Sequence, residues 1–337
     1  MATVDLFAIG NALIDQEFKV SNEFLTQQAL QKGTMQLTDG ETQAALYQQL
    51  QDTQNYKGQA SGGSAANTTV AFSALGGTAF YGCRVGNDDL GSIYLNGLNE
   101  AGIKTAAQSI SEGVTGTCMV LISPDSERTM HTYLGITAEL TAEQIDFEPL
   151  KAAKWLYIEG YLSTSDTARV AVKQARELAK AHSVKIALSL SDPAMVQYAR
   201  QGLEELLDDG VDLLFCNEQE ALMFSNTETL DAAIEVLKSK NQHIVITQGA
   251  NGAVIIDPEQ QFHVAGREVH AVDTNGAGDA FAGAFLYAIN AGLTLEAAAQ
   301  LAILISSEVV AQFGPRLAVE NYAKLFEQFK NSQQEYA

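Results

Sequence analysis

The second half of the chain alternates short apolar runs with longer amphipathic stretches. The apolar runs cover residues 155–159, 184–189, 211–216 and 243–247, and amphipathic stretches such as 168–181 and 232–238 lie between them. Runs of this kind are typical of strands buried on both faces, and the helices between them supply the crossovers of a parallel sheet. A similar run at residues 4–10 predicts one more strand. The pattern therefore predicts an α/β fold, with a mostly parallel central sheet and helices on both faces.

Other stretches of the first half alternate apolar and polar residues one by one. They lie at 16–20, 33–38, 116–123 and 128–135, and the last two flank the turn residues Pro124, Asp125 and Ser126. A period of two is typical of strands with one covered face. We expect a small second sheet built from two separate parts of the chain, roughly 12–40 and 111–135, with a helical piece near 41–50. Because no low-complexity linker interrupts the sequence, we expect residues 1–337 to form a single domain that carries this sheet.

Composition narrows the range of functions. Of the 337 residues, 46% are hydrophobic, and the formal net charge is −21. This excess of acidic residues argues against nucleic acid or an anionic membrane as a partner. The sequence contains no apolar run of membrane-spanning length and no charged-then-apolar secretory start. Cys83, Cys118 and Cys216 are far apart and lack metal-ligand spacing, so we expect reduced thiols in a cytoplasmic protein.

Two glycines and an aspartate mark the start of a predicted helix near residue 279. Gly276 and Gly278 allow the backbone to approach a ligand closely, and the free N–H groups of a first helical turn favour an anion. Asp279 adds a carboxylate at the same place. Such a site suits phosphoryl transfer to a hydroxyl, since the donors take the phosphate charge and the carboxylate takes the proton. The structural alternative is an acidic residue that stabilises an ordinary first turn. The helix is predicted to bury one apolar face, formed by Ala280, Phe281, Ala284, Phe285, Ala288 and Ile289.

Four further polar patterns follow predicted strands or open predicted helices, and each also has a structural explanation. Asp15 ends the segment Gly10-Asn11-Ala12-Leu13-Ile14-Asp15 and could be a turn aspartate. Asn67, in Gly62-Gly63-Ser64-Ala65-Ala66-Asn67-Thr68, could bind a ligand or only cap a helix. Asn217 and Glu220 could simply start a helix, and the Asn251-Gly252 pair in Thr247–Ala253 is also a hairpin signal. Neither a P-loop nor a dinucleotide-binding glycine fingerprint occurs.

The string Asp273-Thr274-Asn275-Gly276-Ala277-Gly278-Asp279 resembles the motif Asp-Thr-x-Gly-Ala-Gly-Asp of the ribokinase-like (PfkB) family of sugar and nucleoside kinases. The other patterns occur in the order typical of this family, so the resemblance covers nearly the whole chain. It implies a ribokinase-like fold in which the small sheet is a lid over the acceptor site. It also implies that the amides of Gly276, Ala277 and Gly278 form an anion hole and that Asp279 is the catalytic base.

The resemblance also implies ligands for the remaining patterns. Acceptor binding is expected from Asn11, Asp15, Gly62, Gly63 and Asn67, and we add Arg128 as a lid cation, with an exposed arginine as the alternative. ATP binding is expected from Asn217, Glu220, Thr247, Gly249, Gly252 and Thr274, with the helix near 295–310 beside the adenine. Glu220 is expected to place Mg²⁺ through water. ATP and Mg²⁺ are thus the expected cofactors, and a monovalent cation such as K⁺, common in the family, is neither confirmed nor excluded by the sequence.

The implied reaction is ATP-dependent phosphorylation of a primary hydroxyl. Residues 62–68 and the segment Glu127-Arg128-Thr129-Met130 look most like the adenosine-kinase-like branch, so the expected acceptor is the 5′-hydroxyl of a ribonucleoside, adenosine first. A sugar kinase acting on ribose, fructose or a related sugar is one alternative. The other is a nucleoside- or nucleotide-binding regulator without catalysis. We expect a monomer or homodimer whose partners are ATP and the small-molecule acceptor.

Overall fold

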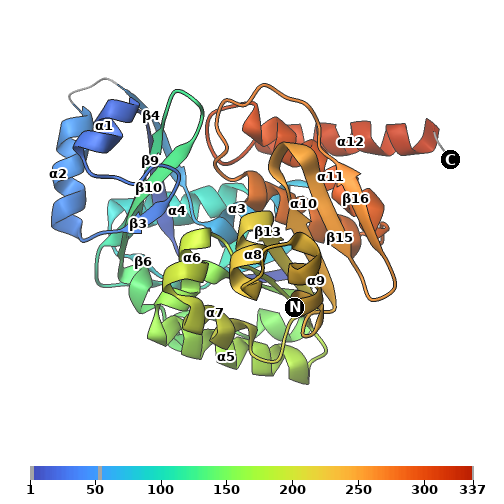
Figure 1. The fold of residues 1–337 in the computed structure, drawn as a ribbon. Helices are drawn as coiled ribbons and strands as arrows, with labels where there is room; N and C mark the ends of the chain where they lie inside the picture. Colours follow the sequence, from blue (N-terminus) through green and yellow to red (C-terminus); the bar gives the residue numbers. More distant parts are fainter. Residues whose placement is uncertain (1–3, 52–54, 336–337) are drawn as a thin grey trace.

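The computed structural model describes residues 4–51 and 55–335, so both ends of the expected 1–337 domain lie outside the described residues. A nine-stranded sheet forms its centre, in the order β16-β15-β14-β13-β12-β11-β1-β5-β7 (Figure 1). Its strands are β1 (Leu6–Ile9), β5 (Ala79–Gly82), β7 (Lys104–Thr105), β11 (Trp155–Glu159), β12 (Lys185–Ser189), β13 (Leu213–Asn217), β14 (His243–Thr247), β15 (Gly252–Ile256) and β16 (Gln261–Ala265). Neighbours from β14 to β7 pair in parallel, and β15 and β16 add an antiparallel edge. The mostly parallel sheet expected from the sequence is confirmed.

Two helical layers cover the central sheet. In β1, Leu6 and Ala8 belong to one buried cluster, whereas Phe7 and Ile9 belong to another, as the period of a strand requires. The first layer contains α3 (Ser64–Ala74), α4 (Asp89–Glu100), α10 (Ala277–Asn290), α11 (Leu295–Val310) and α12 (Val319–Glu335). The second contains α5 (Asp166–Ala181), α6 (Pro193–Tyr198), α7 (Arg200–Leu207), α8 (Glu218–Ser225) and α9 (Leu230–Lys238). Burial on both faces explains the near-continuous apolar runs.

A five-stranded second sheet stands beside the carboxyl ends of the central strands (left in Figure 1), in the order β3-β10-β9-β2-β4. It consists of β2 (Leu13–Lys19), β3 (Met35–Leu37), β4 (Tyr56–Ser61), β9 (Thr115–Ile122) and β10 (Arg128–Gly135). Strands β9 and β10 form the antiparallel hairpin around Pro124. Helices α1 (Asn22–Gln27) and α2 (Gly40–Gln51) accompany the sheet, and β4 lies outside the two ranges expected from the sequence.

The burial of α10 differs from the pattern read from the sequence. We expected one apolar face, but eight residues from Ala280 to Ala288 are buried, including Ala282 and Gly283. The helix packs against both α3 and α11, so its small residues are covered too. A Cβ at residue 283 would collide with the Thr68 carbonyl oxygen, which shows how closely α3 approaches.

The remaining elements are short. Strands β6 (Val85–Gly86) and β8 (Ile110–Ser111) form a separate parallel pair, and 3-10 helices occupy Ala107–Ser109, Ile136–Glu139, Ala142–Gln144, Pro149–Ala152, Gly160–Thr164 and Gly249–Asn251. All three cysteines are buried and free, in line with the expected thiols. Within residues 4–51 and 55–335, no helix combines the length and the hydropathy that crossing a bilayer requires.

Candidate active site

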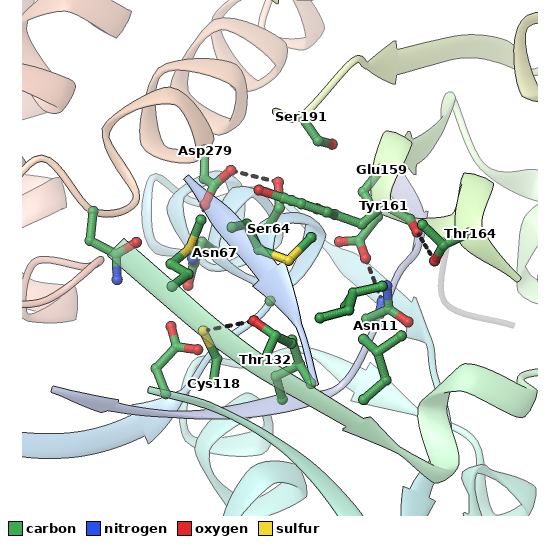
Figure 2. A pocket seen from close by; sticks show the side chains of 18 of the residues that line it. Asn11, Ser64, Asn67, Cys118, Thr132, Glu159, Tyr161, Thr164, Ser191 and Asp279 are labelled. Atoms are coloured by element: carbon green, nitrogen blue, oxygen red, sulfur yellow. Dashed lines mark hydrogen bonds between the residues drawn. The ribbon is translucent and has the colours of Figure 1, made fainter. Parts of the chain in front are cut away.

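A cavity opens between the carboxyl ends of the central strands and the second sheet (Figure 2). Asn11, Glu159 and Ser191, which end or closely follow β1, β11 and β12, line it from the central sheet. The other lining residues are Leu13, Asp15, Met35, Leu37, Gly63, Ser64, Asn67, Cys118, Arg128, Met130, Thr132, Leu134, Tyr161, Thr164, Asn275 and Asp279. The cavity encloses about 670 Å³, including its open mouth. Its place at the strand ends and its apolar wall with a few polar groups are typical of small-molecule sites.

Asp279 lies in the first turn of α10 and faces this cavity. Its Oδ1 accepts a hydrogen bond from Ser64 Oγ at 2.6 Å, and its Oδ2 accepts one from Asn67 Nδ2 at 2.8 Å. Both donors come from the first turns of α3, so the two helix starts face each other across the site (Figure 2). Burial raises the pKa of Asp279 above its ordinary value, and the two hydrogen bonds partly offset that rise.

The backbone before Asp279 presents free donors. Gly276 has φ = 73°, and a Cβ there would collide with the Pro315 carbonyl oxygen, so this position requires glycine. The Ala277 N–H reaches the Thr274 carbonyl at 3.4 Å. The amides of Gly276, Gly278 and Asp279 have no acceptor within the described part of the chain. Three N–H groups are therefore available to an anion at the start of α10, with the helix dipole behind them.

Asp15 lies in β2, on the second-sheet wall of the cavity, and is 6% exposed. Burial raises its pKa to about 7, against the effect of Arg316. The two glycines before α3 give it room, because a Cβ at residue 62 would overlap the Asp15 carboxylate. Gly63 has φ = 89°, and a Cβ there would meet the Asn11 carbonyl oxygen. Gly62 itself does not line the cavity, so its part in the site is to let Asp15 approach.

Two arginines bring positive charge to this acidic site. Arg128, the cation expected in the second sheet, donates from Nη1 to Asn275 Oδ1 at 2.8 Å. Arg316 was not anticipated from the sequence, and its Nε donates to Asn67 Oδ1 at 2.7 Å.

Ser64 and Asn275 belong to strings noted in the sequence, but we assigned them no role. Arg316 has no such signal, because it follows Gly314-Pro315 far from every motif and only the fold brings it to Asn67.

Glu159 is a further residue that the sequence analysis missed. It ends β11, is fully buried, and accepts from the N–H groups of Asn11 and Ala65, each at 2.7 Å. Burial raises its pKa to about 7, and those two hydrogen bonds act in the opposite direction. This carboxylate joins the end of β1 to the start of α3, and thus fixes Asn11 relative to the Gly63–Asn67 turn. The sequence offered one signal for Glu159: it is an acidic residue at the end of a strand that is apolar up to Ile158.

A second pocket lies on the other side of the Gly276–Asp279 turn. Thr247, Gly249 and Gly252 line it from the β14–β15 connection, and Thr274, Ala277 and Gly278 line it from the start of α10. Ile303, Ser306, Ser307 and Val310 of α11 complete one wall, which places the expected helix beside this pocket. Residues 274–279 therefore divide two cavities: Asn275 and Asp279 face the first, whereas Thr274, Ala277 and Gly278 face the second.

Asn217 and Glu220 line neither cavity. They form a capping box at the start of α8: Asn217 Oδ1 accepts from Glu220 N at 2.8 Å, and the Glu220 carboxylate accepts from Asn217 N and Nδ2 at 3.0 and 2.7 Å. Burial raises the pKa of Glu220 to about 8. The structural role that the sequence offered as an alternative, a helix start, is thus present in the fold. Within residues 4–51 and 55–335, no group of three or more His, Cys, Asp or Glu side chains is arranged to hold a metal.

Two cavities that meet at a glycine-lined helix start, beside a parallel sheet with a second sheet over one cavity, define the architecture of a ribokinase-like phosphotransferase. The family model described as "pfkB family carbohydrate kinase" matches residues 5–321 of this chain, which therefore belongs to that family.

Of three similar proteins, two are named adenosine kinase and one is named a probable sugar kinase. The chain is 29% identical to an adenosine kinase of Saccharomyces cerevisiae over 345 residues, which covers 96% of this chain and 100% of the yeast protein. The structure of adenosine kinase from Sinorhizobium meliloti matches with a TM-score of 0.91 and 33% identity, and covers 97% of this chain and 99% of that one. A probable sugar kinase from Rhizobium etli matches with the same TM-score and coverage at 32% identity.

Proposed function

We propose that this chain is an adenosine kinase, which transfers the terminal phosphoryl group of ATP to the 5′-hydroxyl of the nucleoside. The observation that carries the proposal is the division of two cavities by residues 274–279, with a carboxylate on one side and glycine-flanked amides between them. A hydroxyl in the first cavity and a phosphate in the second would meet at this partition. Holding the two reactants in line is the main part of catalysis in phosphoryl transfer.

The proposed roles of the partition follow from its geometry. Asp279 accepts the hydroxyl proton, while the free amides of Gly276, Gly278 and Asp279 stabilise charge on the transferred group. Hydrogen bonds from Ser64 and Asn67 favour the ionised form that a base requires. Thr247, Gly249, Gly252 and Thr274 form the ATP site with α11. The second sheet acts as a lid that excludes water, and Arg128 brings its charge to the partition.

The first cavity suits a ribonucleoside better than a bare sugar. Its polar end contains Asp15, Asn67 and Asp279, where Asp15 can accept two ribose hydroxyls. Its second-sheet wall is apolar and would pack against a base, and it is formed by Leu13, Met35, Leu37, Met130 and Leu134. The names of the yeast and Sinorhizobium relatives support adenosine, and the name of the Rhizobium relative keeps a sugar as the alternative.

Mg²⁺ is proposed to bind chiefly to the ATP phosphates and water. The donor set fits only an indirect contact, because both carboxylate oxygens of Glu220 already accept hydrogen bonds from Asn217. Asn217 and Glu220 would thus hold waters of the ion, and a nearby cation would favour the ionised form of Glu220. When bound, Mg²⁺ neutralises charge on the transferred phosphate.

An ADP-release assay with adenosine, ribose and fructose tests the proposal. We expect turnover with adenosine, no turnover without Mg²⁺, and little turnover with either sugar. Turnover with fructose but not adenosine would establish the sugar kinase, and binding without turnover of any acceptor would establish the regulator. Comparing K⁺ with choline in the same assay decides whether a monovalent cation acts. Cytoplasmic location and a monomeric or homodimeric state remain predictions, for cell fractionation and light scattering respectively.

A further inference from the structure

The loop Gln312–Arg316, here called the C-terminal loop, lies between α11 and α12 and contacts the turn that carries Asp279. Gly314 N donates to Asp273 Oδ2 at 3.0 Å, and the Pro315 backbone packs against Gly276 so closely that no Cβ fits there. Within the loop, Gln312 Nε2 donates to the Arg316 carbonyl at 2.7 Å. These contacts fix the backbone of Arg316 relative to the Gly276–Asp279 turn.

The side chain of Arg316 determines which way the Asn67 amide points. A guanidinium only donates, so the Arg316 Nε–H contact at 2.7 Å requires the Asn67 oxygen to face it. The Asn67 NH₂ group is then directed to Asp279 Oδ2, at 2.8 Å. If the amide turned over, its oxygen would face the carboxylate of Asp279 and its NH₂ group would face a cation. Both contacts would then be repulsive.

We propose that Arg316 is a positioning residue that acts through Asn67 on the carboxylate of Asp279. This role rests on the proposed kinase function, in which Asp279 is the base. The charge of Arg316 acts in the same direction as its hydrogen bond, because it lowers the pKa of Asp279 against the effect of burial. Its Nη2 is buried and has no protein partner within the described residues, so the guanidinium is not held there by a full set of structural contacts.

The pH profile of an Arg316→Gln variant tests this role, measured by kcat and kcat/KM for adenosine with MgATP. Loss of the oriented amide and of the charge is expected to lower kcat by about 10- to 100-fold, as small misplacements of catalytic groups do. The acidic limb of the profile is expected to move to higher pH, while KM for ATP changes by less than about twofold. A parent-like kcat and an unmoved acidic limb would overturn the proposal.

A double-mutant cycle tests whether Arg316 acts through Asn67. If it does, combining R316Q with N67A leaves kcat close to that of N67A alone, whereas independent roles would multiply the two losses. The matched control is Arg176→Gln, which removes another buried arginine whose partners are the Leu207 and Gly210 carbonyls and Asp209. We expect that change to lower thermal stability without moving the pH profile. If the acidic limb of the pH profile moved by a similar amount in R176Q, the effect of R316Q would be due to general destabilisation, and the proposal would be wrong.

A second substitution of Arg316 and the activity of the parent enzyme separate a failure of the proposed role from other failures. If R316Q fails to fold by circular dichroism, R316K carries the test: it keeps the charge without the planar guanidinium, and we expect about a tenfold lower kcat with normal ATP binding by calorimetry. Parent-like turnover of R316K would then overturn the proposed role. An inactive parent enzyme would instead refute the kinase function, so the two failures are distinguishable.

Discussion

At the residue scale, the hydrogen-bond partners of Asp279 differ from those of an ordinary helix-start aspartate. Its two carboxylate oxygens accept from Ser64 and Asn67, side chains of another helix, and not from its own first turn. Asp279→Asn keeps the size of the side chain and removes its capacity to take a proton. We expect kcat to fall by about 10²- to 10⁴-fold, the usual contribution of a general base, with ATP affinity by calorimetry nearly unchanged.

Asp166→Asn provides the matched control for that substitution. Asp166 also lies in a first helical turn, that of α5, but its side chain is 92% exposed and pairs with Arg169. Because Asp166 lines neither of the two cavities of the proposed site, D166N is expected to retain the parent kcat. If D279N were as active as D166N, the carboxylate of Asp279 would be no more than a helix-stabilising acid.

At the scale of elements, the sequence predicted the bounds of helices and strands best where a segment had one clear hydrophobic period. The predicted ranges 155–159, 243–247, 128–135 and 295–310 agree with β11, β14, β10 and α11 as observed. The face predicted for α10 is buried apart from Ile289, which is half-buried, but burial extends beyond that face. Small residues such as Gly283 appear neutral in a hydrophobic pattern but allow the close approach of α3. Arg316 could not be predicted, because its partner Asn67 lies 249 residues away in the chain. The sequence showed Glu159 only as an acidic residue at the end of an apolar strand, and its partners, 148 and 94 residues away, are brought to it by the fold.

Gly276 and Gly278 lie on either side of Ala277 at the start of α10, and their contributions to stability and to ligand binding can be tested separately. Gly276→Ala places a methyl group at φ = 73° and against the Pro315 carbonyl oxygen. We expect it to lower the free energy of unfolding by about 1–3 kcal/mol, the usual cost of such backbone strain, and to abolish most turnover because the amides shift. Denaturant unfolding and the ADP-release assay measure the two effects.

Gly278→Ala is the companion variant at the same turn. Apart from its chain neighbours and the nearby backbone of its own helix, no described atom lies within 4 Å of a Cβ placed at residue 278, which lines the second cavity. Its stability is expected to change by less than about 0.5 kcal/mol, as at an unstrained site, whereas ATP binding weakens because the methyl group occupies space needed by phosphate. Equal loss of stability in G276A and G278A would contradict the distinction between a conformational and a ligand-facing glycine.

At the scale of the whole molecule, the second sheet and the turn before α10 each bury an acidic residue where they approach each other. Glu17 of β2 is 7% exposed, and Asp273, which begins the catalytic string, is fully buried. Gly314 of the C-terminal loop lies between them: its N–H binds Asp273 at 3.0 Å, and a Cβ there would lie 3.6 Å from the Glu17 carboxylate. Burial and the neighbouring charges of Asp273 and Asp15 raise the pKa of Glu17 to about 7.

This raised pKa makes the free energy of unfolding depend on pH. The folded protein keeps the proton on Glu17 between its ordinary value of 4.5 and about 7, whereas the unfolded chain releases it, so the free energy of unfolding falls as pH rises through that window. Glu17→Gln removes the penalty and is expected to stabilise the protein by about 1–2 kcal/mol at pH 8 and by much less at pH 5. Denaturant unfolding at both pH values measures the difference, with the exposed Glu112→Gln as control. A gain of the same size at both pH values would show that the folded protein does not keep a proton on a buried Glu17.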